Sequence, residues 1–203
     1  MELVIATQNK KKLEEINHML KGLGFKITSL AQYKNLPEII EDGRTFKDNA
    51  IKKAVVIAKH LNKLTLGEDS GLEVKPLDNR PGVFSSRYSG RDATDKKNNK
   101  LILKELGKLA LKKRKARYVC SVAISDGKKV IFHAEGYCNG LIDFKEKGKA
   151  GFGYDPLFLI PKYKKTFGEL GEEIKHKMSH RYKAFRKVRK FILRLQACRK
   201  SLR

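Results

Sequence analysis

The sequence predicts an α/β protein with a mixed central sheet flanked by helices. Short apolar runs, typical of buried strands, alternate along the chain with segments whose apolar residues recur at helical spacing. Two extended runs flank Asp126-Gly127, a strong hairpin signal. The length of 203 residues, with 40% hydrophobic and 33% charged residues, suits one globular domain. The first apolar run is too short for a signal peptide, and no stretch approaches a membrane span.

The N-terminal third begins with a strand, a helix and a second strand. Leu3–Ala6 is fully apolar and predicts the first buried strand. The helix that follows is indicated by apolar residues at helical spacing, namely Leu13, Ile16, Leu20 and Leu23. Gly22 and Gly24 are expected to end it. Phe25–Leu30 predicts the second strand.

A longer helix is expected from Thr45 to about Leu61. Thr45 and Asp48 form a near-capping box at its start. Its inward apolar stripe consists of Phe46, Ala50, Ala54, Ile57 and Leu61. Asn49 and Lys53 fall on the same face. A lysine there is expensive unless it is paired, so either its stem snorkels to solvent or its ammonium group faces a phosphate.

The segment Leu64–Val74 carries two adjacent carboxylates, Glu68 and Asp69. We expect a short strand that stops at these acids, a turn made by Ser70-Gly71 at the sheet edge, and a second short run. Open α/β sheets bind ligands beyond the carboxyl ends of their strands. The segment therefore forms either an ordinary turn or a ligand-binding site that contains the two acids.

The C-terminal half predicts two helices and three strands. Thr94 or Asp95 begins a helix that reaches roughly Leu111. The hairpin strands are Ala116–Ser125 and Val130–Asn139, and Leu157–Ile160 predicts a further strand. The last helix begins at Ser179, with an apolar face made by Tyr182, Phe185, Val188, Ile192 and Leu195.

The net charge of +24 arises from 46 basic and 22 acidic residues. Such a balance is often found in nucleic-acid-binding proteins. However, the lysines are scattered, and Lys outnumbers Arg by 34 to 12, whereas bidentate recognition favours Arg. We favour a solvated lysine-rich surface whose field attracts small polyanions such as nucleotides. The alternative is a basic nucleic-acid-binding protein without hydrolase activity.

The three cysteines are odd in number and widely spaced, at Cys120, Cys138 and Cys198. This pattern fits reduced thiols in a cytosol and offers no cysteine-based metal site.

Cations stand at the starts of two predicted helices, Lys10–Lys12 in one case and His180 and Arg181 in the other, with Lys175 and Lys177 just before the second helix. Because the positive end of the helix dipole is already there, such residues indicate a shared anion. Hard carboxylate ligands at Glu41, Glu68 and Asp69 favour Mg²⁺ with substrate phosphates. In Gly148–Pro156, three glycines surround two aromatic rings that could stack on a base. Together these features predict a nucleotide-handling enzyme that lacks a P-loop.

Six segments, in order, resemble the inosine triphosphate pyrophosphatase family, also called non-canonical purine NTP (dITP/XTP) pyrophosphatases. They are Ile5–Lys12, Thr45–Ala50, Glu68–Leu72, Pro81–Tyr88, Gly151–Pro156 and Ser179–Arg181. The resemblance implies one elongated, two-lobed domain over residues 1–203 with a nucleotide cleft between the lobes. It also implies Mg²⁺-dependent hydrolysis of ITP, dITP and XTP to the monophosphate and pyrophosphate, usually by a homodimer. From the composition we expect a cytoplasmic protein with no membrane or specific nucleic-acid partner.

The resemblance also assigns site residues. It implies that Asp69 is the proton acceptor and, with Glu41, a metal ligand. The implied substrate-binding residues are Thr7, Gln8, Asn9, Lys10, Lys11, Lys12, Lys53, Ser70, Phe152, Gly153, Tyr154, Asp155, Lys175, His180 and Arg181. Among these, the first six form the triphosphate loop and Phe152 stacks on the purine.

The sequence departs from the family pattern at two places. Many members carry two acids before the residue matching Asp42, whereas here Ile40 precedes Glu41. Either Glu41 alone or Glu38 therefore completes the metal site. Ala150 replaces a common glycine, which is tolerated if its φ stays negative. A related pyrophosphatase with a preference for pyrimidine or modified bases is a further possibility.

Overall fold

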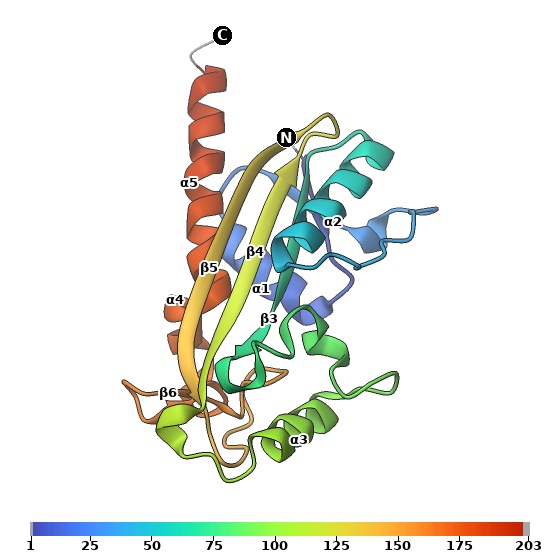
Figure 1. Ribbon diagram of the computed structural model, residues 1–203. Helices are drawn as coiled ribbons and strands as arrows, with labels where there is room; N and C mark the ends of the chain where they lie inside the picture. Colours follow the sequence, from blue (N-terminus) through green and yellow to red (C-terminus); the bar gives the residue numbers. More distant parts are fainter. Residues whose placement is uncertain (1, 201–203) are drawn as a thin grey trace. The chain divides into compact units, whose positions relative to one another are not determined.

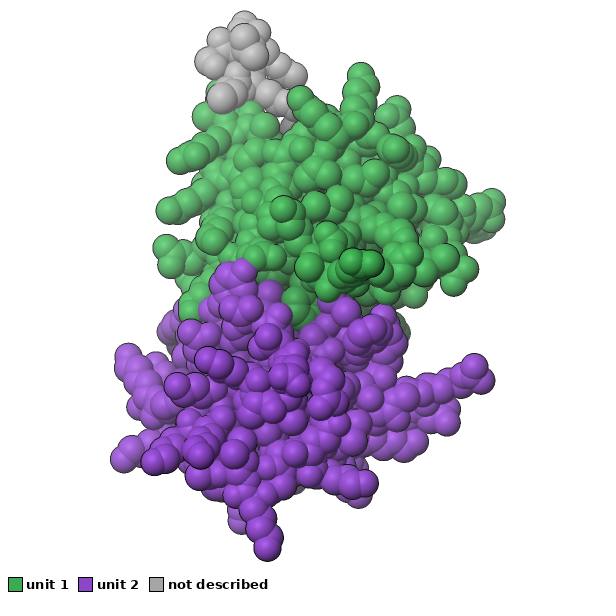
Figure 2. All heavy atoms as spheres, in the orientation of Figure 1, with its two compact units in different colours: residues 1–69, 120–136, 181–203 green, residues 70–119, 137–180 purple. Residues whose placement is uncertain are grey.

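The computed structural model describes residues 2–200, without the side chains of His176 and residues 198–200. The chain divides into two compact units (Figure 2). Unit 1 contains residues 1–69, 120–136 and 181–203, and unit 2 contains residues 70–119 and 137–180. The single domain with a nucleotide cleft between lobes stays a prediction.

The predicted mixed sheet is confirmed: within residues 2–200 it has seven strands in the order β2-β1-β3-β4-β5-β6-β7. Figure 1 labels β3 to β6 of this sheet. The strands are β1 Glu2–Ala6, β2 Lys26–Ser29, β3 Thr65–Val74, β4 Lys115–Ser125, β5 Val130–Ile142, β6 Phe158–Ile160 and β7 Lys165–Thr166. β1 pairs in parallel with β2 and β3, whereas β6 pairs antiparallel with β5 and β7. The central strands β3, β4 and β5 contribute residues to both units.

Unit 1 is built from the parallel strands and the helices α1 (Lys10–Leu20), α2 (Phe46–Leu61) and α5 (His180–Lys200, from Arg181 onward). The predicted apolar positions of α1 and α5 meet strand residues in one core, which includes Leu3, Ile5, Ile16, Leu20, Leu66, Phe185, Val188 and Ile192. The stripe of α2 packs in two smaller clusters, through Ile57 in one and through Ala50 and Ala54 in the other. Phe132 of β5 stacks on Phe191 of α5 at 4.4 Å between ring centroids. The helical face predicted for the last helix is therefore its core face.

The start of α2 follows the sequence closely. Thr45 Oγ1 accepts a hydrogen bond from Asp48 N, and Asp48 Oδ2 accepts one from Thr45 N, each at 3.1 Å. This reciprocal capping box satisfies two backbone donors that the first turn leaves without helical partners. Asn49 and Lys53 lie on the buried face of the helix as predicted.

Unit 2 contains α3 (Asp95–Leu106) and α4 (Phe167–Met178) around a separate core, which includes Leu72, Ile102, Tyr118, Cys138, Phe158 and Phe167. Thr94 caps α3, but the predicted end near Leu111 is wrong because Gly107, at φ 49°, terminates the helix earlier. α4 and β7 escaped prediction. Gly171, at φ 72°, kinks α4 and divides its helical pattern into two short pieces.

The two cysteine side chains that the structure describes, Cys120 and Cys138, are buried. Cys198 lies outside the described side chains. Among the described helices, none has the length and apolar character needed to cross a membrane.

Candidate functional site

The two adjacent acids lie inside a continuous strand, so the predicted turn at Ser70-Gly71 is wrong. β3 extends unbroken from Thr65 to Val74 between β1 and β4, and the φ of Gly71 is not positive. Pairing with the neighbouring strands outweighs the local turn preference of Asp-Ser-Gly. Glu68 and Asp69 are 1% and 5% exposed, so they occupy no sheet edge and need partners.

The two acids lie beyond the carboxyl end of β1 but inside β3, so the expected position at the end of their own strand is wrong. β1 ends at Ala6, which pairs with Gly67 of β3. Glu68 and Asp69 follow directly, where β3 continues past the end of β1. A Cβ on Gly67 would overlap the carbonyl oxygen of Ala50, so a glycine is what lets α2 approach β3 this closely. This approach brings the α2 side chains onto the acids.

Lys53 is the centre of an acidic cluster in unit 1. Its Nζ lies 2.9 Å from Glu41 Oε2 and 3.2 Å from Asp69 Oδ1, and it donates to the carbonyl oxygen of Glu68 at 3.3 Å. Glu38 is exposed in the preceding loop, so the acid that reaches this cluster is Glu41. The buried lysine is therefore paired with carboxylates rather than snorkelling to solvent.

The pKa values in the cluster reflect both burial and charge. Burial raises the pKa of Asp69, against the opposing effects of Lys53 and Lys12. Burial alone would lower the pKa of Lys53, but Asp69 and Glu41 outweigh it and the pKa is raised. Lys53 thus stays charged, while Asp69 holds its proton more tightly than an exposed aspartate does.

Glu68 is held by a second set of cations. Arg181 donates from Nη2 and Nε to Glu68 Oε1 at 3.1 and 3.3 Å, and Lys12 Nζ lies 2.9 Å from Oε2. Cys120 donates its thiol proton to Oε1 at 3.4 Å, and burial raises the pKa of that thiol well above its ordinary value. Arg181, only 2% exposed, also donates to Glu15. The cations at the two helix starts are thus paired, at least in part, with protein carboxylates.

The predicted triphosphate loop joins β1 to α1. Asn9 caps α1 by accepting a hydrogen bond from Lys12 N at 3.1 Å, and its own N–H donates to Thr7 Oγ1 at 3.2 Å. Thr7 is half-buried, whereas the side chains from Gln8 to Lys11 are exposed. Unit 1 therefore gathers the loop, Glu41, Lys53, Asp69 and Arg181 of the predicted set.

Unit 2 gathers the Gly-aromatic loop, Lys175 and His180. Asp155, 2% exposed, accepts hydrogen bonds from Phe152 N at 2.9 Å and Lys175 Nζ at 2.7 Å on Oδ2. A Cβ on Gly151, at φ 78°, would overlap that same oxygen. Ala150 has no positive φ, so the methyl group is tolerated there as expected.

Aromatic rings support this loop. Lys175 Nζ lies 4.7 Å from the centroid of the half-buried Phe152 ring. Tyr118 donates to Asp155 Oδ1 at 3.2 Å, and its ring stacks on that of His180 at 4.7 Å and 11°. Asp155 therefore acts as the internal brace of the loop, with the ring of Phe152 in the loop and the ring of His180 stacked on Tyr118.

The remaining predicted residues of unit 2 have mainly structural surroundings. Tyr154 is 4% exposed and donates to the Ser85 carbonyl oxygen at 2.8 Å. The Gly153 N–H donates to Asp95 Oδ2 at 2.8 Å. Ser70 is half-buried in β3.

Comparison with known proteins decides the family. The sequence profile described as the Ham1 family matches residues 3–191. The chain belongs to the Ham1 family. It is 45% identical over 195 residues to the dITP/XTP pyrophosphatase of Desulforamulus reducens, covering 96% of this chain and 97% of that protein. The dITP/XTP pyrophosphatase of Halalkalibacterium halodurans is 42% identical, with 94% and 98% covered.

A solved structure agrees with these relatives. The HAM1 protein from Coxiella burnetii superposes with a TM-score of 0.89 at 35% identity, covering 96% of this chain and 99% of that one. The resemblance inferred from six short motifs is thus confirmed for nearly the whole Ham1 chain.

Four residues escaped the sequence-based assignment of the site. Glu15 accepts a hydrogen bond from Arg181, which binds Glu68, and Cys120 donates to Glu68 directly. Tyr118 supports the loop, and Asn49 donates from Nδ2 to Asp69 Oδ2 at 3.1 Å. Only Asn49 gave a signal, as a polar residue on a buried helical stripe. The others depend on contacts between distant segments.

The donor set near Lys53 fits Mg²⁺. Glu41 and Asp69 contact the same ammonium nitrogen, so their oxygens are close neighbours, and both are hard ligands. In the part of the chain that the structure describes, no group of three or more His, Cys, Asp or Glu side chains is placed to hold a metal. Two carboxylates are nevertheless what Mg²⁺ commonly takes from a protein when substrate phosphates supply other ligands.

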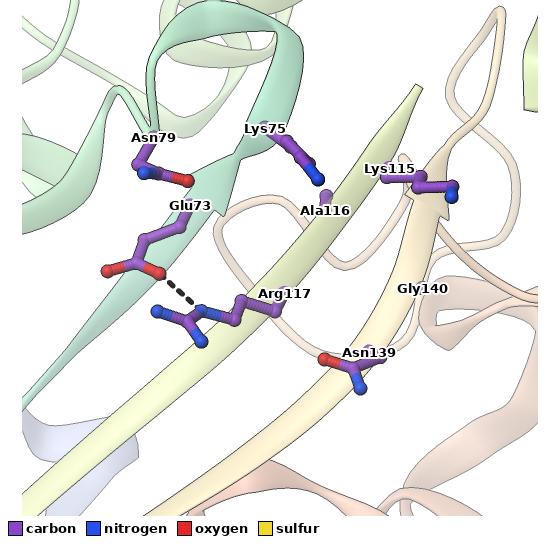
Figure 3. Close-up of a pocket in the computed structure, with 8 residues that line it drawn as sticks. All are labelled: Glu73, Lys75, Asn79, Lys115, Ala116, Arg117, Asn139 and Gly140. Atoms are coloured by element: carbon purple, nitrogen blue, oxygen red, sulfur yellow. Dashed lines mark hydrogen bonds and ion pairs between the residues drawn. The ribbon is translucent and has the colours of Figure 1, made fainter. Parts of the chain in front are cut away.

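A separate pocket lies in unit 2 and contains none of the predicted site residues. Its volume is about 470 Å³. It lies over β3, β4 and β5, where Figure 3 shows Arg117 paired with Glu73. The other lining residues are Lys75, Asn79, Lys115, Ala116, Asn139 and Gly140. The candidate site rests on the paired acids and the Gly-aromatic loop instead.

Proposed function

We propose that this Ham1 protein is a Mg²⁺-dependent nucleoside triphosphate pyrophosphatase. It hydrolyses the non-canonical purine nucleotides ITP, dITP and XTP to the monophosphate and pyrophosphate and so cleanses the nucleotide pool. The observation that carries this proposal is the Lys53 cluster, in which one buried ammonium group is bracketed by Glu41 and Asp69. The dITP/XTP pyrophosphatase names of relatives that match nearly end to end support the same activity.

The proposed mechanism assigns the chemistry to unit 1. Asp69 accepts a proton from water, the water oxygen bonds to the α-phosphorus, and the bond from that phosphorus to the β-bridging oxygen breaks. Lys12 and Lys53 stabilise the negative charge that develops on the departing pyrophosphate. When bound, Mg²⁺ supplies further charge neutralisation and orients the phosphates. Asn49 and Lys53 hold one Asp69 oxygen each, which fixes the orientation of the base.

The base-recognition role falls to unit 2. The Phe152 ring offers a stacking face, and His180 is positioned by its own stacking on Tyr118. A site built to pair with a 6-oxo group leaves polar atoms unpaired when adenine presents an amine there, so ATP should be a poor substrate. Guanine shares the 6-oxo group, so this contact does not separate ITP from GTP.

The test is pyrophosphate release from ITP, XTP, GTP and ATP in the presence of Mg²⁺, with pyrimidine triphosphates added to the panel. The proposal requires a higher kcat/KM for ITP and XTP than for ATP, and loss of turnover when EDTA removes the metal. Equal efficiency on all nucleotides would refute the purine selectivity. A preference for pyrimidine nucleotides would identify a related pyrophosphatase instead.

The net charge of +24 favours one competing function, a basic nucleic-acid-binding protein without hydrolase activity. For that function, the logarithm of the binding constant for RNA or DNA should fall linearly with the logarithm of the salt concentration. It also predicts no Mg²⁺-dependent release of pyrophosphate. The same assay, combined with filter binding at several salt concentrations, separates the two functions.

We further propose that the enzyme acts in the cytoplasm as a homodimer. The odd number and wide spacing of the three cysteines support a reducing compartment. The dimer rests on the family resemblance alone. Light scattering coupled to size exclusion tests it, because a mass near 23.2 kDa would indicate a monomer.

A further inference from the structure

We infer that Asn49 is a positioning residue that holds the Glu41 loop and Asp69 together and thereby sets the affinity of the site for a divalent cation. The inference rests on the proposed function, because it concerns the same pair of acids. It adds a residue to which neither the comparisons nor the motif resemblance assigned a role.

The two ends of the Asn49 amide bind two different segments. Its Nδ2 donates to Asp69 Oδ2 at 3.1 Å, and its Oδ1 accepts a hydrogen bond from Gly43 N at 2.8 Å. The partners fix the orientation of the amide, because a carboxylate only accepts and a backbone N–H only donates. Asn49 is 1% exposed, so water does not readily replace either partner.

The loop is attached to α2 at three successive residues. Glu41 pairs with Lys53 at 2.9 Å, Asp42 pairs with Lys52 at 2.6 Å, and Gly43 donates to Asn49. The Asp42–Lys52 pair is exposed, and such pairs contribute little. The buried attachment through Asn49 is therefore the one that holds the loop backbone in place.

Gly43 is matched to this contact. A Cβ at position 43 would lie 2.5 Å from Asn49 Oδ1 and 2.8 Å from the Cβ of Asp48. Any larger residue must push the loop away from the helix. Gly43→Ala thus disturbs the attachment from the loop side and changes neither Asn49 nor either acid.

The consequence concerns cation binding. Two carboxylates bind a small cation well only when their separation is fixed, and side chains that orient metal ligands commonly affect metal affinity about 10–100-fold. Asn49 orients Asp69 directly and orients Glu41 through the backbone two residues away. Loss of this link should weaken cation binding more than it slows the chemical step.

The experiment measures Mn²⁺ affinity by EPR titration of the full chain, and separately the Mg²⁺ concentration that half-activates ITP hydrolysis. We expect Asn49→Ala and Gly43→Ala each to weaken Mn²⁺ binding at least about 10-fold, with a matching rise in the half-activating Mg²⁺ concentration. The double variant should bind Mn²⁺ no more weakly than the weaker-binding of the two single variants, because both substitutions break the same link.

Asn98→Ala is the matched control. Asn98 is also a buried asparagine, 3% exposed, and it binds backbone in unit 2. Its loss should lower stability comparably without changing Mn²⁺ affinity. Mn²⁺ affinity within twofold of wild type in folded Asn49→Ala and Gly43→Ala overturns the inference, as does equal weakening in Asn98→Ala.

Asp69→Asn separates the two proposals. Unchanged Mn²⁺ affinity in this variant overturns both the cation site and the role of Asn49. Mn²⁺ binding that depends on Asp69 and Asn49, without pyrophosphate release from any nucleotide, overturns the proposed function and leaves the positioning role supported.

Discussion

The two clusters of candidate residues, one in unit 1 and one in unit 2, differ in the charges and rings that they contain. In unit 1, buried charges of both signs alternate: Lys53 pairs with Glu41 and Asp69, and Glu68 pairs with Lys12 and Arg181. In unit 2, one buried ion pair between Asp155 and Lys175 braces a glycine loop that carries aromatic rings. The first arrangement suits charged phosphates, and the second suits a flat base.

Substitutions in the charged cluster of unit 1 and in the glycine-aromatic loop of unit 2 should change different kinetic constants. A residue of unit 1 that acts on the reacting phosphate should change kcat, whereas a residue of unit 2 that contacts the base should change KM and the choice among bases.

Asp69→Asn should lower kcat on ITP by about 10²–10⁴, the usual contribution of a general base. Asparagine keeps the size of the side chain, so the fold should persist. Steady-state pyrophosphate release measures the effect, with circular dichroism as the check on folding. A kcat within tenfold of wild type would remove Asp69 from the role of base.

Asp155→Ala should destabilise the protein by about 3–5 kcal/mol, because it leaves the buried ammonium group of Lys175 without its carboxylate. Urea unfolding gives the change. A matched exposed ion pair lies on the same helix, where Lys177 contacts Glu173 at 2.7 Å. Glu173→Ala should change stability by less than about 1 kcal/mol. Equal losses in the two variants would show that Asp155 is no brace.

Gly151→Ala should cost about 1–2 kcal/mol for the positive φ alone, and more because the new methyl group meets the Asp155 carboxylate. Its KM for ITP should rise more than its kcat falls. Ala150→Gly is the neighbouring control, since Ala150 has no positive φ. A KM unchanged in Gly151→Ala would argue against the loop as part of the base site.

Without Mg²⁺, Asp69→Asn should melt at or above the wild-type temperature at pH 7. Burial raises the folded-state pKa of Asp69, so stability is lost as pH rises from the unfolded value near 3.8 through the raised folded value. Asparagine has no such titration. Calorimetry from pH 4 to pH 7 should show that the melting temperature of the variant rises relative to that of wild type as the pH increases. A lower melting temperature for the variant across this range would contradict the raised pKa.

The sequence predicted those parts of the fold that depend on local patterns. The Thr45 capping box, the apolar run Leu3–Ala6 and the face of the last helix are each set by residues a few positions apart. The turn predicted at Ser70-Gly71 failed because pairing with distant strands decides that segment. Asp69-Ser70-Gly71 suits a turn locally, but pairing with the neighbouring strands keeps it extended.

The site was predictable as a set of residues but not as a set of contacts. Cations at helix starts indicated an anion, yet spacing gave no sign that Arg181 pairs with Glu15, 166 residues away. The same limit applies to Cys120 on Glu68 and to Tyr118 under His180. Lys53 was visible as a cation on an apolar stripe, because a buried charge stands out in any helical pattern.

The division of labour is tested most directly by the ratio of kcat/KM for ITP to that for ATP, measured by pyrophosphate release in wild type, Asp69→Asn and Phe152→Leu. The account predicts that Asp69→Asn lowers both values and leaves the ratio unchanged, while Phe152→Leu changes the ratio. A ratio altered by Asp69→Asn and untouched by Phe152→Leu would contradict the assignment of chemistry to unit 1 and base recognition to unit 2.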